Sequence, residues 1–157
     1  MLYRKMENHE VHLSNETELH YKVVDFIKRF KQDIILIPGL GENQKTTQTR
    51  SDSYFKGYEA GQVDILILNP HRYYQGLAIE LKTPTGKNNV SNKQKEYLNK
   101  LENLSFKIIV SSDYDLIVVE LLKYFRHVLY PCKHCLGRKY NSKEKLERHN
   151  NYFHKIN

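Results

Sequence analysis

Segments with a helical spacing of apolar residues alternate with short β-branched runs along most of this 157-residue chain. This order restricts the fold more than any other feature, because helices and strands need different periodicities of buried side chains. The expected helices span residues 15–31, 91–104 and 112–125, and the expected strands span 33–37, 63–68, 77–81 and 106–110. The mixture predicts an α/β fold in which helices pack on a sheet.

One long stretch, residues 38–61, lacks this periodicity and contains several glycines. A loop of about 24 residues inside a compact domain is usually functional or partly helical. It carries Lys45, Arg50 and Lys56 among Gln, Thr and Ser residues. These side chains could contact phosphates without recognising a sequence, and a solvated loop explains them equally well.

The tail of the chain carries most of its net positive charge. The whole sequence has 25 basic and 18 acidic residues, and residues 126–157 hold eight of the former and two of the latter. A strongly basic tail on a nearly neutral body is typical of an attached module that binds a polyanion, although a solvated tail is the alternative. We therefore expect two domains, residues 1–126 and 127–157.

Several classes of protein are excluded by composition. No apolar run approaches the roughly 18–20 residues that a membrane-spanning helix needs. The first residues lack the apolar core of a signal peptide, and the only cysteines, Cys132 and Cys135, are too few for a disulfide scaffold. These features predict an intracellular protein of the cytoplasm or nucleus, not bound to a membrane, and a viral or mobile-element source is compatible with them.

Three polar residues occupy the two central strands of the predicted sheet. Glu80 and Lys82 lie on one face of their strand because side chains alternate between faces. Asp64 begins the neighbouring strand of the expected hairpin, so its carboxylate can approach that of Glu80. Two close carboxylates repel each other unless a cation such as Mg²⁺ or Mn²⁺ lies between them. The alternative is an ordinary solvent-facing strand, on which Glu and Lys often alternate.

Glu16 is a fourth polar residue of interest, because it falls on the apolar stripe of the first expected helix. A carboxylate on such a stripe is costly unless it caps the helix or faces a charge. Its position at the helix N-terminus keeps capping open as an alternative. Glu18 lies on the opposite face of the helix and is expected to be solvated.

A resemblance gives these residues a context. The body, from about residue 16 to 111, resembles the VRR-NUC branch of the PD-(D/E)xK nuclease superfamily. The matching stretches are ETELH (16–20), GYEAGQVDI (57–65), YQGLAIELKTP (74–84), GK (86–87) and SNKQ (91–94). The chain departs from the family pattern at Val63, where Pro usually precedes the Asp, and in a longer spacer between residues 86 and 91.

The resemblance implies a restriction-endonuclease-like αβββαβ core and a divalent-metal-dependent nuclease. Asp64, Glu80 and the backbone carbonyl of Leu81 would hold Mg²⁺ or Mn²⁺, with Glu16 binding directly or through water. Lys82 would position the attacking water, and Gln94 would lie near the active site. For Gln94 an alternative remains, because SNKQ (91–94) also fits a helix capping box.

The basic tail contains the ligand pattern of a metal module. Cys132 and Cys135 have a two-residue spacing, and His149 and His154 follow at a distance that resembles a Cys2His2 zinc finger. Two thiolates and two imidazoles suit tetrahedral Zn²⁺. A segment this short cannot bury enough core to fold alone, so we expect a ββα unit that folds on zinc. The alternative is a chance grouping of Cys and His in a disordered tail.

The helix of such a finger would present Ser142, Lys145 and Arg148 where base-contacting side chains usually project. The finger could instead bind protein or stabilise a dimer. His127 and His134 do not fit the ligand spacing. Outside the tail, the hairpin-tip residues Tyr73 and Tyr74 could stack on bases or merely cover the edge of the sheet.

Together these features predict a Mg²⁺-dependent endonuclease that cleaves DNA and uses a zinc finger to bind it. By family resemblance, a homodimer acting on branched DNA, such as junctions or flaps, is the expected form. A restriction-type enzyme that recognises a short sequence is the nearest enzymatic alternative. A non-catalytic DNA-binding or adaptor protein built on a nuclease scaffold is the alternative from another class.

Overall fold

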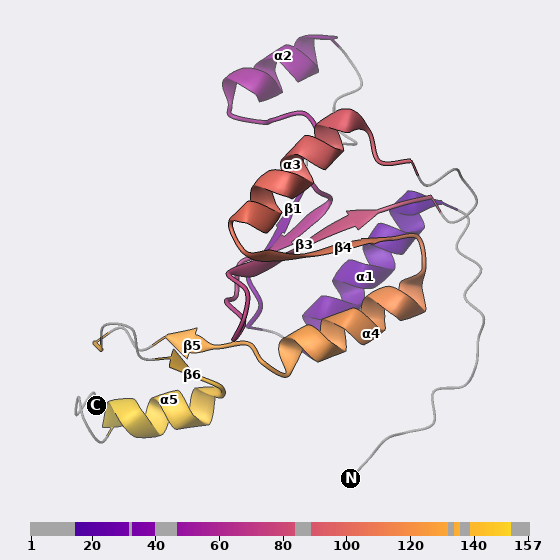
Figure 1. Ribbon diagram of the computed structural model, residues 1–157. Coiled ribbons are helices and arrows are strands. Elements are labelled where there is room, and N and C mark those ends of the chain that lie inside the picture. The colour runs from indigo at the N-terminus through magenta and orange to yellow at the C-terminus, as the bar shows by residue number, and fades with distance from the viewer. Residues whose placement is uncertain are drawn as a thin grey trace.

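The computed structural model describes residues 15–31, 33–39, 47–83, 89–131, 134–135 and 139–151. Its main sheet has four strands in the order β1-β2-β3-β4 (Figure 1). They are β1 (Leu36–Pro38), β2 (Ile65–Ile67), β3 (Gly76–Leu81) and β4 (Phe106–Ser111). β2 runs antiparallel to both β1 and β3, and β4 runs parallel to β3. The predicted α/β class is therefore confirmed.

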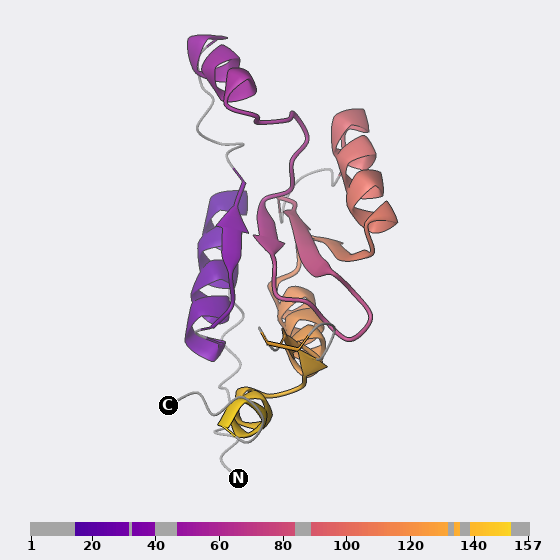
Figure 2. The same cartoon turned by 90° about the vertical axis from the view of Figure 1, so that its left-hand side faces the viewer.

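Three helices cover this sheet on both faces. α1 (Glu16–Phe30) and α4 (Tyr114–Phe125) share one apolar cluster with alternate residues of β2 and β3, and α3 (Asn92–Asn103) packs on the other face. Figure 2 shows α1 and α3 on opposite sides of the strands. Because side chains alternate along β3, Leu77, Ile79 and Leu81 face α1 and α4, whereas Ala78 packs with the α3 cluster.

The helices begin at capping residues that the sequence supplies locally. The Asn15 side chain accepts a hydrogen bond from the Glu18 backbone, and α1 then buries Leu19, Val23 and Ile27 on one stripe. The third predicted helix begins later than Ser112. Asp113 is its N-cap, because its carboxylate accepts hydrogen bonds from the Asp115 and Leu116 amides, so α4 starts at Tyr114.

The long stretch expected to be functional or partly helical contains α2 (Thr47–Phe55). Figures 1 and 2 place α2 away from the sheet, beyond the N-terminal end of α3. Its last two residues, Tyr54 and Phe55, are exposed. Strand β1 also begins later than the predicted residue 33, because the Asn69 side chain bonds the Asp33 carbonyl and the Ile35 amide ahead of it.

A small ββα unit follows α4. It consists of the antiparallel pair β5 (Tyr130–Pro131) and β6 (Lys139–Tyr140) and of α5 (Lys143–His149). Two backbone hydrogen bonds hold the segment between α4 and β5 against the β2–β3 loop. The Leu129 amide donates to the Pro70 carbonyl at 2.7 Å, and the Arg72 amide donates to the His127 carbonyl at 2.9 Å. Within the described ranges, no helix has the length and apolar character needed to cross a membrane.

Candidate active site

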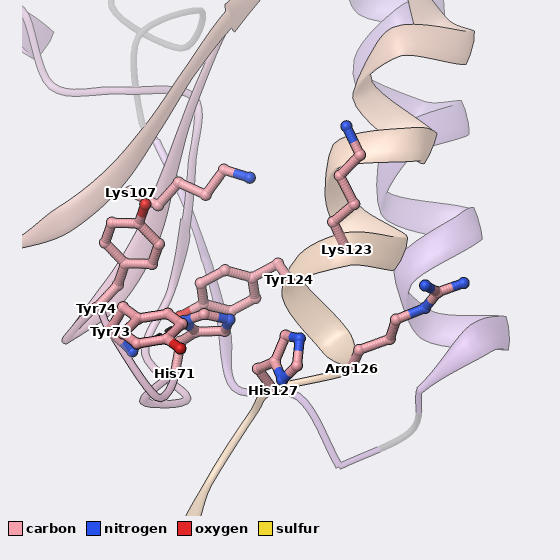
Figure 3. A pocket seen from close by; sticks show the side chains of 8 residues that line it. All are labelled: His71, Tyr73, Tyr74, Lys107, Lys123, Tyr124, Arg126 and His127. Carbon is pink, nitrogen blue, oxygen red and sulfur yellow. Dashed lines mark hydrogen bonds between the residues drawn. The ribbon is translucent and has the colours of Figure 1, made fainter.

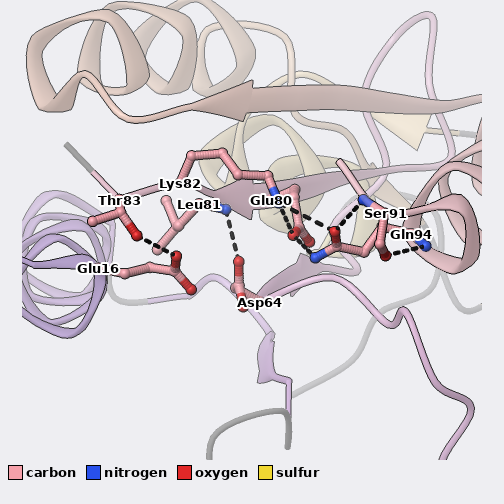
Figure 4. Close-up of polar contacts among 8 residues, drawn as sticks. All are labelled: Glu16, Asp64, Glu80, Leu81, Lys82, Thr83, Ser91 and Gln94. Atoms are coloured by element: carbon pink, nitrogen blue, oxygen red, sulfur yellow. Dashed lines mark hydrogen bonds and ion pairs between the residues drawn. The ribbon is translucent and has the colours of Figure 1, made fainter. Parts of the chain in front are cut away.

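The predicted catalytic residues of the body meet at one end of the sheet (Figure 4). Ile65 of β2 pairs with Ile79 of β3, so Asp64, just before β2, and Glu80, just after Ile79, are neighbours across the two strands. Glu80 is 2% exposed and lies on the face of the sheet that α3 covers. The approach of Asp64 to Glu80 that strand alternation predicts is thus present.

Asp64 is fixed by both of its neighbouring strands. Its Oδ2 accepts a hydrogen bond from the Leu81 amide at 2.7 Å, and its backbone carbonyl accepts one from the Gly39 amide at 2.7 Å. Gly39 has no room for a side chain, because a Cβ there would lie 2.4 Å from the Val63 carbonyl oxygen. The end of β1 therefore presses directly against the residues that carry Asp64.

Lys82 bridges two other members of the site. Its Nζ donates to Glu80 Oε1 at 2.8 Å and to Gln94 Oε1 at 3.3 Å. The lysine side chain is only 10% exposed, so this ion pair is shielded from water. A buried amine of this kind is held in one orientation, which a surface lysine is not.

Gln94 combines the two roles that the sequence left as alternatives. Its amide and side chain form a reciprocal capping box with Ser91 at the start of α3. The same side chain donates through Nε2 to Glu80 Oε1. The cap therefore sets the orientation in which Gln94 contacts both Glu80 and Lys82.

Glu80 has a perturbed pKa. Burial raises its pKa to about 7, Lys82 opposes this shift, and the negative charges of Asp64 and Glu16 add to it. Its Oε2 is buried and accepts no hydrogen bond from the described residues. A buried carboxylate oxygen without a donor is costly, so this arrangement fits a site that gains a cation.

Glu16 does not cap its helix, since Asn15 has that role. The Glu16 carboxylate instead accepts a hydrogen bond from the Thr83 hydroxyl at 3.4 Å, beside the end of β3. Glu18 is exposed, as expected from its place on the opposite face. The helix thus points one of its two N-terminal acids toward the strand that carries Glu80.

Two residues of this region were missed by the sequence analysis. Thr83 contacts Glu16, and the Tyr58 hydroxyl has a raised pKa because of its burial and the nearby charges of Asp64 and Glu80. Tyr58 lies in the stretch 57–65 that carried the resemblance, but no periodicity marks its side chain. Only the path of the chain from α2 to β2 brings it to the carboxylates.

The donor set of the site consists of hard oxygen atoms, which Mg²⁺ and Mn²⁺ prefer. Glu80 offers a buried oxygen to which no described residue donates a hydrogen bond, and Asp64 and Glu16 are near enough to repel its charge. Among the described residues, however, no three His, Cys, Asp or Glu side chains are grouped closely enough to hold a metal ion. The predicted metal site therefore stays a prediction.

A solved structure shares this arrangement of strands and helices. The chain is similar to a "VRR_NUC domain protein" with a TM-score of 0.56 and 24% identity, over 71% of this chain and 88% of that one. The body has a VRR_NUC-type fold. No protein-family model matches the chain, and no curated protein matches it significantly in sequence.

Beside the VRR_NUC-type fold, the ββα unit brings together two of the four predicted zinc ligands. Cys135 Sγ lies 3.3 Å from His149 Nε2, and the His149 ring is buried against Tyr140. Tetrahedral Zn²⁺ would set a thiolate and an imidazole nitrogen about 3.5 Å apart. Cys132 and His154 lie outside the described residues, so the zinc site stays a prediction.

The residues predicted to bind nucleic acid lie on two separate elements. Lys56 is exposed just after α2, and Lys145 and Arg148 are exposed on α5. Arg50 belongs to α2, and Lys45 lies outside the described residues. The Ser142 hydroxyl caps α5 by accepting a hydrogen bond from the Lys145 amide at 3.3 Å, and its predicted contact with a base stays a prediction.

Proposed function

We propose that the chain is a divalent-metal-dependent endonuclease that hydrolyses DNA phosphodiester bonds. The observation that carries the proposal is the buried Glu80 carboxylate beside Asp64 and the buried Lys82; one oxygen of this carboxylate has no hydrogen-bond donor in the part of the chain that the structure describes. Such a carboxylate group is costly for a mere scaffold to keep. The VRR_NUC-type fold agrees with this function, since the similar structure is named for a nuclease domain.

Asp64, Glu80 and the Leu81 carbonyl would hold Mg²⁺ or Mn²⁺, with Glu16 as a direct or water-mediated ligand. When bound, such an ion polarises a phosphate oxygen and lowers the pKa of a water molecule. Lys82 would orient that water and neutralise charge that develops on the phosphate. Gln94 would fix the positions of the Lys82 amine and the Glu80 carboxylate relative to each other, because it contacts both.

The ββα unit would be a zinc finger that binds nucleic acid, held by Cys132, Cys135, His149 and His154. Its exposed Lys145 and Arg148 would contact DNA, so the finger would raise the local concentration of the nuclease on its substrate. A single finger covers about three base pairs, which is too few for much sequence specificity. From the resemblance to the VRR-NUC family, we propose branched DNA, such as junctions or flaps, as the substrate and a homodimer as the active form.

A cleavage assay tests this function directly. Matched linear, flap and four-way-junction DNAs are incubated with the full chain in Mg²⁺ or Mn²⁺, with Asp64→Ala alongside. Asp25→Ala is a suitable control, because Asp25 is an exposed acid on α1 that pairs with the exposed Arg29. We expect cleavage by the wild type and by Asp25→Ala, and none by Asp64→Ala.

The products separate the alternatives. Preference for the junction or flap supports the structure-selective enzyme, whereas symmetric cuts at a palindrome in plain duplex indicate a restriction-type enzyme. Intact DNA binding without cleavage of any substrate in either metal would contradict the nuclease. The chain would then be a DNA-binding or adaptor protein.

A further inference from the structure

A pocket lies at the other end of the sheet from Glu80, between the β2–β3 loop and the C-terminal end of α4 (Figure 3). Its volume is about 270 Å³. The residues that line it come from three parts of the chain: His71, Tyr73 and Tyr74; Lys107; and Lys123, Tyr124, Arg126 and His127. The proposed catalytic mechanism uses none of them.

The loop side of the pocket is aromatic. The buried His71 ring stacks on Tyr124 with 4.9 Å between centroids, and the Tyr124 hydroxyl is bonded to the Asn69 carbonyl at 2.7 Å. Tyr73 is different, because its ring is 67% exposed and has the Arg72 guanidinium over it at 5.4 Å. The pocket thus has a fixed aromatic base and an accessible aromatic edge.

The opposite side is cationic. Lys107, Lys123 and Arg126 line it, and none of the eight lining residues is acidic. Glu120 bonds both lysines, which keeps the pKa of Glu120 low, so one carboxylate offsets part of the charge of three cations. Burial, His127 and Lys107 all lower the pKa of His71, as expected in a positive field.

A second hollow adjoins the first. Its volume is about 420 Å³, and it shares Tyr73, Tyr74 and Lys107 with the aromatic–basic pocket. The two tyrosines therefore stand between two hollows that share Lys107, and the second hollow is also lined by the acidic Glu102. Proteins that bind unpaired nucleotides combine aromatic side chains, on which the bases stack, with cationic side chains that contact the phosphate backbone.

The position of the pocket suits a contact with the substrate strand away from the cleaved bond. It lies near the start of β3, whereas Glu80 and Leu81 lie at its end, roughly 15 Å further along at about 3.3 Å per residue. The connection to the ββα unit passes directly beside it, since His127 lines the pocket and Val128 forms a bridge with His71.

We propose that this aromatic–basic pocket binds an unpaired nucleotide of single-stranded DNA. The base stacks on Tyr73 and Tyr74, and the neighbouring phosphates lie against Lys123 and Arg126. Bases inside a duplex are covered by their neighbours, so stacking on these tyrosines selects unpaired strands. That the bound polymer is DNA rests on the proposed nuclease function. The pocket itself is tested by measuring binding under conditions without cleavage.

The experiment measures the affinity of the full chain for fluorescein-labelled oligo(dT) and for a mixed-sequence duplex of equal length. Anisotropy is read without added Mg²⁺ or Mn²⁺ at about 0.15 M ionic strength. Tyr73→Ala is compared with Tyr73→Phe, and Tyr21→Ala is the matched control because Tyr21 is 71% exposed on α1. Circular dichroism checks that each variant is folded.

We expect Tyr73→Ala to weaken oligo(dT) binding by roughly 5- to 100-fold, as the loss of one base–aromatic stack predicts. Tyr73→Phe and Tyr21→Ala should keep the wild-type affinity. Lys123→Gln and Arg126→Gln should each weaken binding and reduce its salt dependence by about one phosphate contact. Duplex affinity should change much less in Tyr73→Ala.

Unchanged oligo(dT) binding by Tyr73→Ala would overturn the proposal, and so would an equal loss for duplex and single strand. Failure of the pocket and failure of the nuclease are distinguishable. Wild-type cleavage together with unaltered binding by Tyr73→Ala rejects the pocket alone. Selective loss of single-strand binding supports the pocket even if the wild type cleaves nothing.

Discussion

At the scale of single residues, the site depends on an amine that is held in place by its partners. Lys82 is nearly buried and donates to both Glu80 and Gln94, and Gln94 is itself fixed by the cap of α3. Its position is thus determined by a strand and a helix together. A lysine held this way can act on a bound phosphate or water without first losing the entropy of a free side chain.

Replacing this amine tests its role. Lys82→Met keeps the aliphatic stem and removes the charge, and we expect the single-turnover cleavage rate to fall by about 10²–10³-fold, as for other preorganised donors. DNA affinity should stay close to the wild-type value. Lys95→Met is the control, because Lys95 is exposed on the same helix as Gln94. Cleavage by Lys82→Met at the wild-type rate would show that the assigned role is wrong.

At the scale of elements, the N-terminus of α3 depends on a close approach by the chain that leads into β2. Gly61 has φ +94°, and a Cβ there would lie 2.5 Å from the Lys93 backbone. This contact positions the first turn of α3, from which Gln94 reaches the site. Gly57 has a similar φ of +89°, but no atom lies within 4 Å of its would-be Cβ.

The two glycines form a matched pair of variants. Gly57→Ala should lower the free energy of unfolding by about 1–2 kcal/mol, because a residue with a side chain is strained in the left-handed conformation. Gly61→Ala should cost a further ~1–3 kcal/mol because backbone must move, and it should also slow cleavage by displacing Gln94. Urea unfolding and cleavage rates check both expectations. Equal losses for the two variants would contradict the close packing at Lys93.

The ββα unit is the second element with a requirement of its own, because it has few buried residues and is proposed to need zinc. Cys135→Ser should abolish zinc binding, unfold the unit and weaken DNA affinity, and it should spare the metal-dependent chemistry of the body. His134→Ala is the control, since His134 is exposed and does not fit the ligand spacing. Zinc content by elemental analysis decides the matter: full zinc in Cys135→Ser would rule out this ligand assignment.

At the scale of the whole molecule, the ββα unit is fastened to the body beside the C-terminus of α1. Lys143 of α5 lies 3.3 Å from Asp33, and the Lys31 amine lies over the Tyr130 ring. Burial would raise the pKa of Asp33, but a hydrogen bond from Tyr130 and the positive charge of Lys143 bring it below its usual value. The unit is therefore held by these polar contacts and by the packing of Tyr130 against the apolar cluster of the body.

Removing the Asp33 carboxylate should weaken the contact between the ββα unit and the body. Asp33→Ala should cost about 1.5–3 kcal/mol, as for hydrogen bonds to a charged group, and should speed proteolysis between residues 126 and 131. The pKa of Asp33 is lower in the folded chain than in the unfolded chain. The stabilisation by the Asp33 carboxylate is therefore fully present above the unfolded-state pKa, and it is lost as the pH falls through the folded-state pKa. The difference between wild type and variant should shrink in acid. Asp25→Ala, which breaks an exposed pair, should show neither effect.

Local patterns were enough to predict several features of the molecule. Alternation along β3 placed Glu80 and Lys82 on one face, the SNKQ sequence predicted the cap of α3, and the tail pattern predicted the ββα order. Each of these depends on residues a few positions apart, and their chemistry is fixed by backbone geometry alone. That is why they can be inferred before any tertiary contact is known.

Other features were decided only by tertiary structure. Three features depend on segments that are far apart in the chain. They are the contact of Glu16 with Thr83, the approach of Tyr58 to the carboxylates, and the aromatic–basic pocket. Periodicity says which face of an element is buried, but not which other element covers it or where a loop returns. The sequence alone thus determined most of the elements, though not α2, and the pairing of acid and lysine, whereas packing of distant segments decided what surrounds them.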